Sequence, residues 1–334
     1  MKKIITVFIA AIAMLSLVAC GKGNTTKTTA TKEAKSESTK KIKIVTTIFP
    51  EYDWVKQILG DKSENADITM LLDNGVDLHS YQPTAKDIAK ISDCDLFIYV
   101  GGESDEWVDS ALKKATNKNM QVINLLDVLG KNVKEEEVVK GMQAEEEEDE
   151  GEEEGPEYDE HVWLSLNNAK TICQSIDDAL KTIDPDNAKT YEKNTSDYID
   201  KLDTLDLEYK KATSNAKQKT LLFGDRFPFR YMVDDYGLKY YAAFVGCSAE
   251  TEASFKTISF LSKKADELNL KYIMTIEKAD HKIAKTIIKN TKNKDQKILT
   301  LDSMQSTTSK DVKNGTTYLS AMKKNLDVLK KALN

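Results

Sequence analysis

Apolar and polar positions alternate along the chain in a rhythm typical of a parallel β-sheet covered by helices. Apolar runs of strand length are separated by segments whose apolar residues recur every three or four positions, which is the period of a helix. In the first half, this pattern predicts strands at residues 42–48, 68–72, 96–100 and 121–124, and helices at 52–59, 85–92 and 107–116. We therefore expect an α/β lobe here.

A polar interruption around Pro185 separates two longer helical patterns. The first covers residues 168–183, and the second covers residues 187–215 without a proline or a glycine. In the second, large apolar residues from Tyr191 to Tyr209 fall three, four or seven positions apart, which predicts one amphipathic helix. At about 1.5 Å per residue this helix would be roughly 45 Å long, enough to connect two lobes.

The α/β rhythm restarts after this helix. The pattern predicts strands at residues 220–223, 238–244, 272–276 and 297–301, and helices at 255–269, 282–290 and 318–333. The predicted fold class is α/β, with two α/β lobes that have parallel-type sheets and are joined by one long rigid helix. Ligands of such folds bind where the carboxyl ends of strands face each other, so we expect a site in the cleft between the lobes.

The N-terminal residues differ from the rest of the chain. Met1-Lys2-Lys3 precedes an apolar run at residues 4–13 and small residues before Cys20, which is typical of an export signal. Leu-Val-Ala-Cys also resembles the lipobox of bacterial lipoproteins. We expect residues 1–19 to be a lipoprotein signal peptide, and residues 20–41 to be a lipidated Cys20 followed by a flexible tether. An ordinary secreted protein with an incidental Cys20 is the alternative.

The remaining chain divides by pattern into three parts. We expect an N-terminal lobe at residues 42–185, a linking helix at 186–216 and a C-terminal lobe at 217–334. The first part contains an acidic loop at 134–160, and residues 145–160 carry twelve of the acidic residues and no Lys or Arg. Repulsion among these carboxylates predicts a solvated, extended loop, although a role of residues 144–160 in gathering cations is a second hypothesis.

Charge and cysteine content exclude several classes of protein. The formal net charge is -7, and no basic patch indicates nucleic-acid binding. Besides Cys20, the cysteines are Cys94, Cys173 and Cys247, which are widely spaced and form no CxxC pair. The sequence therefore predicts neither a disulfide framework nor a structural zinc knuckle.

Two of the three histidines lie in segments suited to holding a metal ion. His79 follows a predicted strand in the run from Asp77 to Pro83, and His161 follows the acidic stretch directly. Neutral imidazole binds borderline divalent cations, and neighbouring carboxylates orient the ring. These two histidines predict a metal-binding protein. The third, His281, stands at a helix start, where a solvated or capping role is expected.

The segments around these histidines resemble the metal-binding lipoproteins of ABC importers for zinc and manganese, the ZnuA/TroA-like family. The family's motifs read Asp-Pro-His-x-Tyr-x-Pro and Asp-x-His-Val-Trp-Leu-x-Pro-x-x-Ala, and the similarity covers residues 42–334. It implies two α/β lobes with one connecting helix and a single ion between them.

By this resemblance, His79 and His161 match two of the family's ligands. The third family position falls on Gly224, which has no donor, so Asp225 is the expected substitute; Cys247, Glu250, Glu252 and Glu277 are alternatives. The fourth family ligand matches Asp302. Two histidines with two carboxylates do not select the metal, so we expect Zn²⁺ first and Mn²⁺ second.

The expected function is that of an extracytoplasmic solute-binding lipoprotein, not an enzyme. It would capture a divalent metal ion and deliver it to the permease of an ABC importer, as a monomer anchored to the cell membrane through lipid on Cys20. A surface adhesin of the same family is one alternative. A lipid-anchored metallohydrolase is another, but the chain contains no HExxH and no Gly-x-Ser-x-Gly motif.

Overall fold

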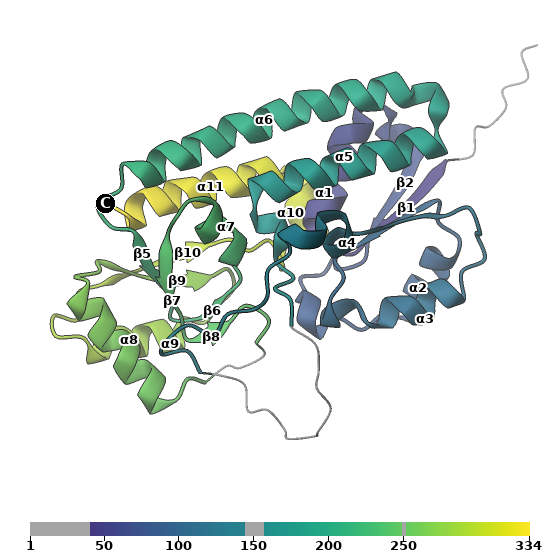
Figure 1. Cartoon of the computed structure of the whole chain (residues 1–334). Helices are drawn as coiled ribbons and strands as arrows, with labels where there is room; N and C mark the ends of the chain where they lie inside the picture. The colour runs from purple at the N-terminus through teal and green to yellow at the C-terminus, as the bar shows by residue number, and fades with distance from the viewer. Residues whose placement is uncertain (1–40, 144–156, 249–251) are drawn as a thin grey trace, which may run out of the picture. The chain divides into compact units, whose positions relative to one another are not determined.

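In the computed structural model, which describes residues 41–143, 157–248 and 252–334, the first half of the chain is built on one sheet (Figure 1). Its strands lie in the order β2-β1-β3-β4 and are all parallel. Their bounds are β1 (Ile42–Thr46), β2 (Ala66–Met70), β3 (Leu96–Tyr99) and β4 (Gln121–Asn124). Ile44 pairs with Ile68 on one side and with Leu96 on the other. The predicted strands and their parallel arrangement are confirmed.

Helices pack around this first sheet. They are α1 (Phe49–Leu59), α2 (Ala85–Ser92), α3 (Trp107–Lys113), α4 (Leu125–Leu129) and α5 (Leu166–Ile183). The first begins three residues earlier than predicted. The side chain of Glu51 accepts hydrogen bonds from the backbone N–H groups of Thr47 and Ile48, which precede the helix, and so caps its first turn. The α4 helix was not predicted, because five residues are too few to show a helical period.

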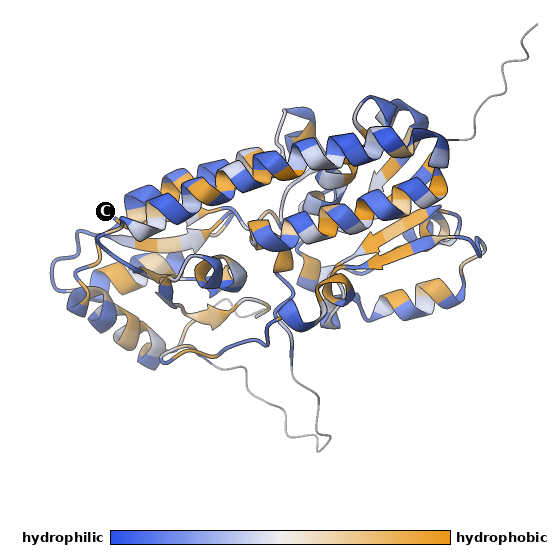
Figure 2. Cartoon of the chain, turned by 45° about the horizontal axis from the view of Figure 1, so that its top comes forward, coloured by the Kyte–Doolittle hydropathy of each residue, from blue (hydrophilic) through white to orange (hydrophobic). Residues whose placement is uncertain are grey.

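The long helix α6 (Ala188–Ser214) follows the predicted course closely. Apolar residues lie along one side of it, which Figure 2 shows as an interrupted orange stripe. Its buried side chains include Tyr191, Leu202 and Tyr209. The helix contacts α1 and α5 from the first half of the chain and α11 (Tyr318–Ala332) from its end. It therefore packs against both parts of the chain that it connects.

The C-terminal part contains shorter strands in parallel pairs. These strands are β5 (Thr220–Leu222), β6 (Arg226–Phe227), β7 (Lys239–Tyr241), β8 (Phe244–Val245), β9 (Tyr272–Ile276) and β10 (Lys297–Leu301). The pairs are β5 with β7, β6 with β8, and β9 with β10, and a bridge between Phe223 and Met274 connects β5 to β9. The prediction of one continuous strand at 238–244 is wrong, since the structure has two shorter strands there, β7 and β8.

The C-terminal helices cover these strands and extend back to the first half. They are α7 (Arg230–Asp235), α8 (Phe255–Glu267), α9 (Lys282–Asn290), α10 (Ser309–Lys313) and α11. At the start of α11, the backbone N–H of Tyr318 donates to Asp53 and its hydroxyl donates to the carbonyl oxygen of Trp163. The last helix therefore connects the end of the chain to residues of the first half.

One hydrophobic core crosses the boundary between the two parts. The largest cluster of buried apolar residues includes Phe97 and Trp163 from the first half and Phe227, Leu301 and Met322 from the second. Trp163 is fully buried, and its indole N–H donates to the carbonyl oxygen of Ser303 at 2.8 Å. The two parts are called here the N-terminal region (residues 41–183) and the C-terminal region (residues 217–334).

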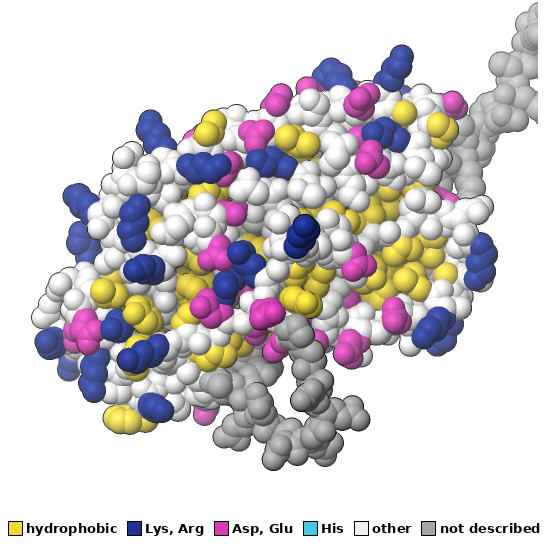
Figure 3. Space-filling model, in the orientation of Figure 1, with side chains coloured by type: hydrophobic (Ala, Val, Ile, Leu, Met, Phe, Trp, Pro, Cys, Tyr) yellow, Lys and Arg dark blue, Asp and Glu magenta, His cyan; other side chains and the backbone are white. Residues whose placement is uncertain are grey.

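Several predictions fall outside the described residues. These are the signal peptide, Cys20 and its lipid, the tether up to residue 40, the centre of the acidic loop and Glu250. Within the described ranges, no helix combines the length and the apolar character needed to cross a bilayer. On the face of the molecule seen in Figure 3, cationic and anionic side chains of the described residues are interspersed.

Candidate metal centre

His79 lies on a short 3-10 turn, Leu78–Ser80, that follows β2. Asp77 caps this turn, because its carboxylate accepts a hydrogen bond from the backbone N–H of His79 at 3.1 Å. The ring is also held, since its Nδ1 lies 2.8 Å from the hydroxyl oxygen of Ser104 and 3.5 Å from Oε2 of Glu160. These contacts leave Nε2 as the nitrogen that faces the interior of the site.

His161 is fully buried and directly precedes the 3-10 turn Val162–Leu164. Asp159 holds it through two contacts, because one carboxylate oxygen lies 2.9 Å from the backbone nitrogen of His161 and 2.9 Å from its ring Nδ1. A carboxylate accepts hydrogen bonds, so Nδ1 carries the proton and Nε2 keeps its lone pair. Carboxylate and imidazole are paired in this way around many metal ions in proteins.

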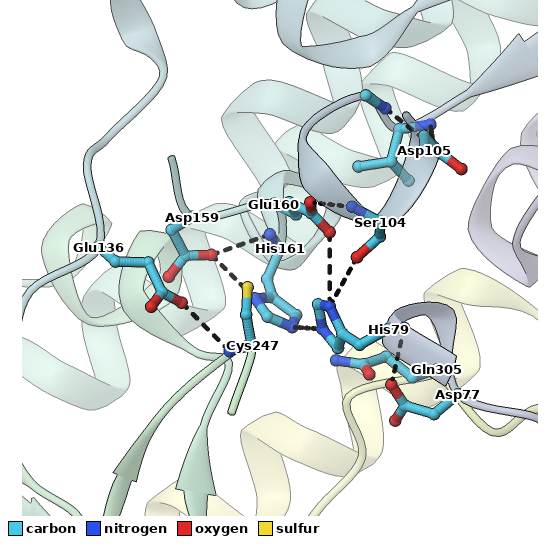
Figure 4. A network of polar contacts seen from close by, with 12 residues as sticks. Asp77, His79, Ser104, Asp105, Glu136, Asp159, Glu160, His161, Cys247 and Gln305 are labelled. Atoms are coloured by element: carbon cyan, nitrogen blue, oxygen red, sulfur yellow. Dashed lines mark hydrogen bonds and ion pairs between the residues drawn. The ribbon is translucent and has the colours of Figure 1, made fainter. Parts of the chain in front are cut away.

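The two rings face each other across the site (Figure 4), with their Nε2 atoms 3.2 Å apart. Two nitrogen ligands of a tetrahedral zinc ion, each about 2.0–2.1 Å from the metal, would lie about 3.3 Å apart. The observed separation therefore suits a shared cation. Two lone pairs at this distance repel each other unless a cation or a proton lies between them.

Burial keeps the imidazole of His79 uncharged. Burial, followed by the neighbouring His161, lowers the pKa of His79 from its ordinary value of 6.5 to about 3. The ring is therefore neutral at neutral pH. Burial raises the pKa of Glu160 from 4.5 to about 7, against the hydrogen bonds that it accepts from Ser104. Glu160 is buried, and its Oε2, which has no hydrogen-bond partner among the described residues, lies nearest to His79.

The C-terminal region contributes Cys247 to this site. Its sulfur and one ring nitrogen each of His79 and His161 all lie within 4.8 Å of one another. Cys247 follows β8 and Gly246, and its backbone N–H donates to Glu136 at 3.1 Å. In Figure 4 the thiol points towards the histidine pair. Burial and then Glu136 raise the pKa of this thiol well above 9.0.

Gln305, also from the C-terminal region, completes the surroundings of the histidine pair. When the Gln305 amide nitrogen donates to Asp77, at 3.0 and 2.8 Å, the amide oxygen lies 2.6 Å from Nε2 of His161 and accepts a hydrogen bond from it whenever that nitrogen carries a proton. Asp77 also forms an ion pair with Arg226, the first residue of β6. This ion pair and the Gln305 amide connect the turn that carries His79 to the C-terminal region.

Asp225 and Asp302, predicted to complete the ligand set, do not join this group. Asp225 accepts hydrogen bonds from the backbone N–H groups of Arg226 and Ile276, at 2.9 and 3.1 Å. Asp302 accepts one from the N–H of Met304 at 2.9 Å. Both carboxylates therefore stabilise the ends of strands. Burial raises the pKa of each, more than these hydrogen bonds lower it.

The structure gives a steric reason why position 224 is a glycine. A Cβ atom there would lie 2.5 Å from the backbone of Ala284, so α9 occupies the space that a side chain would need. Of the alternative ligands, Glu277 accepts two hydrogen bonds from Ser303, and Glu252 is exposed. Cys247 is the alternative that the structure brings to the histidines. Gln305 and Ser104 were missed, although Gln305 follows a predicted strand at the same end as Asp302.

These observations define a class of protein: two α/β regions connected by a long helix, with a closely spaced pair of imidazoles where the regions meet. The chain matches the protein family described as ZnuA, zinc-uptake complex component A, periplasmic, over residues 44–332. The chain belongs to this family.

Named relatives agree with this assignment. The chain is 34% identical over 333 residues to the zinc-binding lipoprotein AdcA of Streptococcus pneumoniae strain R6, covering 99% of this chain and 61% of that protein. It is 33% identical to the high-affinity zinc uptake system protein ZnuA of Bacillus subtilis, covering 99% of this chain and 98% of that protein. The crystal structure of the Zn(II)-bound ZnuA-like domain of S. pneumoniae AdcA matches with a TM-score of 0.67 and 33% identity, covering 88% of this chain and 99% of that domain.

The relatives differ from this chain in length. The chain spans 56 to 61% of the AdcA proteins that it matches, but almost the whole of the B. subtilis protein. The similarity therefore concerns the ZnuA-like part of AdcA, which is the part of the solved structure above.

Proposed function

We propose that the protein binds one Zn²⁺ ion outside the cytoplasm and delivers it to the permease of an ABC importer, with His79 and His161 as two of the ligands. The observation that carries this proposal is the 3.2 Å separation of the two Nε2 atoms. Each ring is held through its other nitrogen, His79 by Ser104 and His161 by Asp159, so both lone pairs are directed at one point.

The three histidines of the chain allow a matched test of metal binding. We expect native mass spectrometry of the purified protein to detect one Zn²⁺ per chain when Zn²⁺ and Mn²⁺ compete, and His79→Ala and His161→Ala to abolish this binding. His281→Ala should retain it, because His281 lies at the start of α9, outside the group of candidate ligands. Full zinc occupancy in both His79→Ala and His161→Ala would contradict the proposal.

Delivery to a permease and attachment to the membrane need separate tests. In cells that lack the native gene, uptake of labelled zinc from zinc-poor medium should be restored by the wild-type protein and not by His161→Ala. Cys20→Ala should move the protein from the membrane fraction to the medium. Zinc uptake at the wild-type rate by the His161→Ala variant would show that transport does not depend on this site. Retention of the Cys20→Ala variant in the membrane fraction would exclude the lipid anchor.

We propose a role in binding without turnover. The carboxylates beside the histidines, Asp159 and Glu160, contact the imidazole Nδ1 atoms and so orient ligands. A metallohydrolase would need a carboxylate placed as a base beside metal-bound water, whereas both of these face the Nδ1 side of the rings, away from the Nε2 atoms proposed as ligands. Hydrolysis of ester or peptide substrates by the zinc-loaded protein, lost in His161→Ala, would overturn this part. Metal-independent attachment to matrix proteins would instead support an adhesin.

A further inference from the structure

Two imidazoles satisfy only half of a tetrahedral zinc ion, so at least one more protein ligand is expected. The sequence pointed to Asp225, but its carboxylate is bonded to two backbone N–H groups at strand ends. Among the Cys, Asp and Glu side chains of the described residues, Cys247 is the one that forms a group of possible ligands with both histidines. The question is whether the fold holds this cysteine at the site or only allows it nearby.

The chain leading into the thiol is fixed from its N-terminal side. Gly246 packs directly on the ring of His161, since a Cβ atom at 246 would lie 2.9 Å from ring Cε1 and 3.0 Å from Nδ1. A side chain at this position would displace the imidazole. The next backbone N–H, that of Cys247, donates to Glu136 at 3.1 Å. These two contacts hold the segment after β8 against the histidine pair.

The spacing also suits a thiolate ligand. With zinc–sulfur and zinc–nitrogen distances of about 2.3 and 2.0–2.1 Å, sulfur and nitrogen would lie about 3.6 Å apart around a tetrahedral ion. The sulfur and one ring nitrogen of each histidine lie within 4.8 Å of one another, so a movement of about an ångström, such as a rotation of the cysteine side chain, would bring them to ligand spacing.

On the strength of the proposed function, we infer that Cys247 is the third protein ligand and that the site takes thiophilic divalent cations, Zn²⁺ and its softer analogue Cd²⁺, in preference to Mn²⁺. Soft thiolate ligands favour such metals, whereas Mn²⁺ favours carboxylate and carbonyl oxygen. When the metal–sulfur bond forms, the sulfur–hydrogen bond breaks and one proton leaves to water. The amide oxygen of Gln305, beside His161, is a neutral donor for the fourth position.

Cobalt provides a direct probe of the sulfur. Titration of the purified wild-type protein with Co²⁺ should give a thiolate-to-cobalt charge-transfer band in the near ultraviolet with an amplitude of one sulfur per ion. Cys247→Ser should lose this band, and Cys94→Ser, which alters a buried thiol between α2 and β3, should keep it. The wild-type spectrum alone tests the ligand, even if a variant were to fold poorly.

Metal competition tests the consequence for selectivity. Removal of residues that only orient a metal ligand costs about 10–100-fold in affinity, so Cys247→Ser should weaken Zn²⁺ and Cd²⁺ binding by at least about 100-fold. Mn²⁺ binding should change little, so the preference for zinc over manganese should fall by a similar factor.

The outcomes separate the two proposals. If His79→Ala and His161→Ala abolish binding while wild type lacks the charge-transfer band and Cys247→Ser binds zinc normally, the role of Cys247 is overturned and the zinc-binding function stands. If wild-type protein binds no metal at all, the proposed function fails as well. A band that is present in wild type and absent in Cys247→Ser establishes the sulfur ligand.

Discussion

The two regions contribute to the candidate metal centre in different ways. The N-terminal region contains a continuous four-stranded sheet, and each histidine lies in or beside a 3-10 turn where a neighbour fixes it, His79 by Ser104 and His161 by Asp159. The C-terminal region has short paired strands, and its contributions, Cys247 and Gln305, come from the connections after β8 and β10. The N-terminal region thus holds the two proposed nitrogen ligands in fixed positions, and the C-terminal region adds the proposed sulfur ligand and an amide.

The largest effect is expected from Trp163, because its replacement weakens the contact between the two regions. Its indole is fully buried and spans the boundary through the hydrogen bond to Ser303. Trp163→Ala should lower the free energy of unfolding by about 3–5 kcal/mol, measured by urea denaturation. Trp163→Phe keeps an aromatic ring but leaves the Ser303 carbonyl without its donor, so about 1–3 kcal/mol is expected. Equal stability of all three proteins would mean that this contact does not hold the regions together.

Replacing Asp159 tests whether the N-terminal region orients the imidazoles. Asp159→Asn keeps the shape but removes the charge that holds the proton on Nδ1 of His161. Zinc affinity, measured by chelator competition, should fall by about 10–100-fold. The matched control is Asp225→Asn, which alters a carboxylate outside the ligand group and should leave zinc affinity unchanged. A loss of affinity in Asp225→Asn would instead restore the ligand that the sequence predicted.

The pH dependence of stability should depend partly on Glu51 in the N-terminal region. Burial, and then Asp105, raise its pKa from 4.5 to about 8. Between these values the folded state holds a proton that the unfolded state has released, so stability falls as the pH rises from about 4.5 to about 8. The slope is at most about 1.4 kcal/mol per pH unit. Glu51→Gln should flatten this slope in urea denaturation series, and an unchanged slope would assign the pH dependence to other groups.

The smallest effect is expected on the helix that connects the regions. Lys193 and Asp197 form an exposed ion pair one turn apart on α6. Lys193→Ala should change the free energy of unfolding by less than about 0.5 kcal/mol, because exposed pairs on a helix contribute little. A loss above about 1 kcal/mol in thermal denaturation would show that α6 depends on its surface charges as well as on its buried face.

How much the sequence predicted also differs between the regions. The strands of the N-terminal region were found because each is a separate apolar run, and His79 and His161 were found because histidine is rare and both lie in motifs. In the C-terminal region, one apolar run concealed the break between β7 and β8. Cys247 stands directly after that break, so its place beside His161 depends on a tertiary contact at Gly246 that no periodicity reveals. Asp225 follows a strand as predicted, but its carboxylate accepts hydrogen bonds from two backbone N–H groups. The sequence pattern does not predict these tertiary hydrogen bonds.

The return of α11 to the N-terminal region has a mechanical consequence. Tyr318 contacts Asp53 and Trp163 at the start of α11, and Tyr209 on α6 donates to the carbonyl oxygen of Met322 within it. The regions are therefore coupled through two helices packed along each other, and a wide hinge opening would have to break buried hydrogen bonds in both. We expect the ion to be released by small sliding movements and by displacement of the segments that carry Cys247 and Gln305.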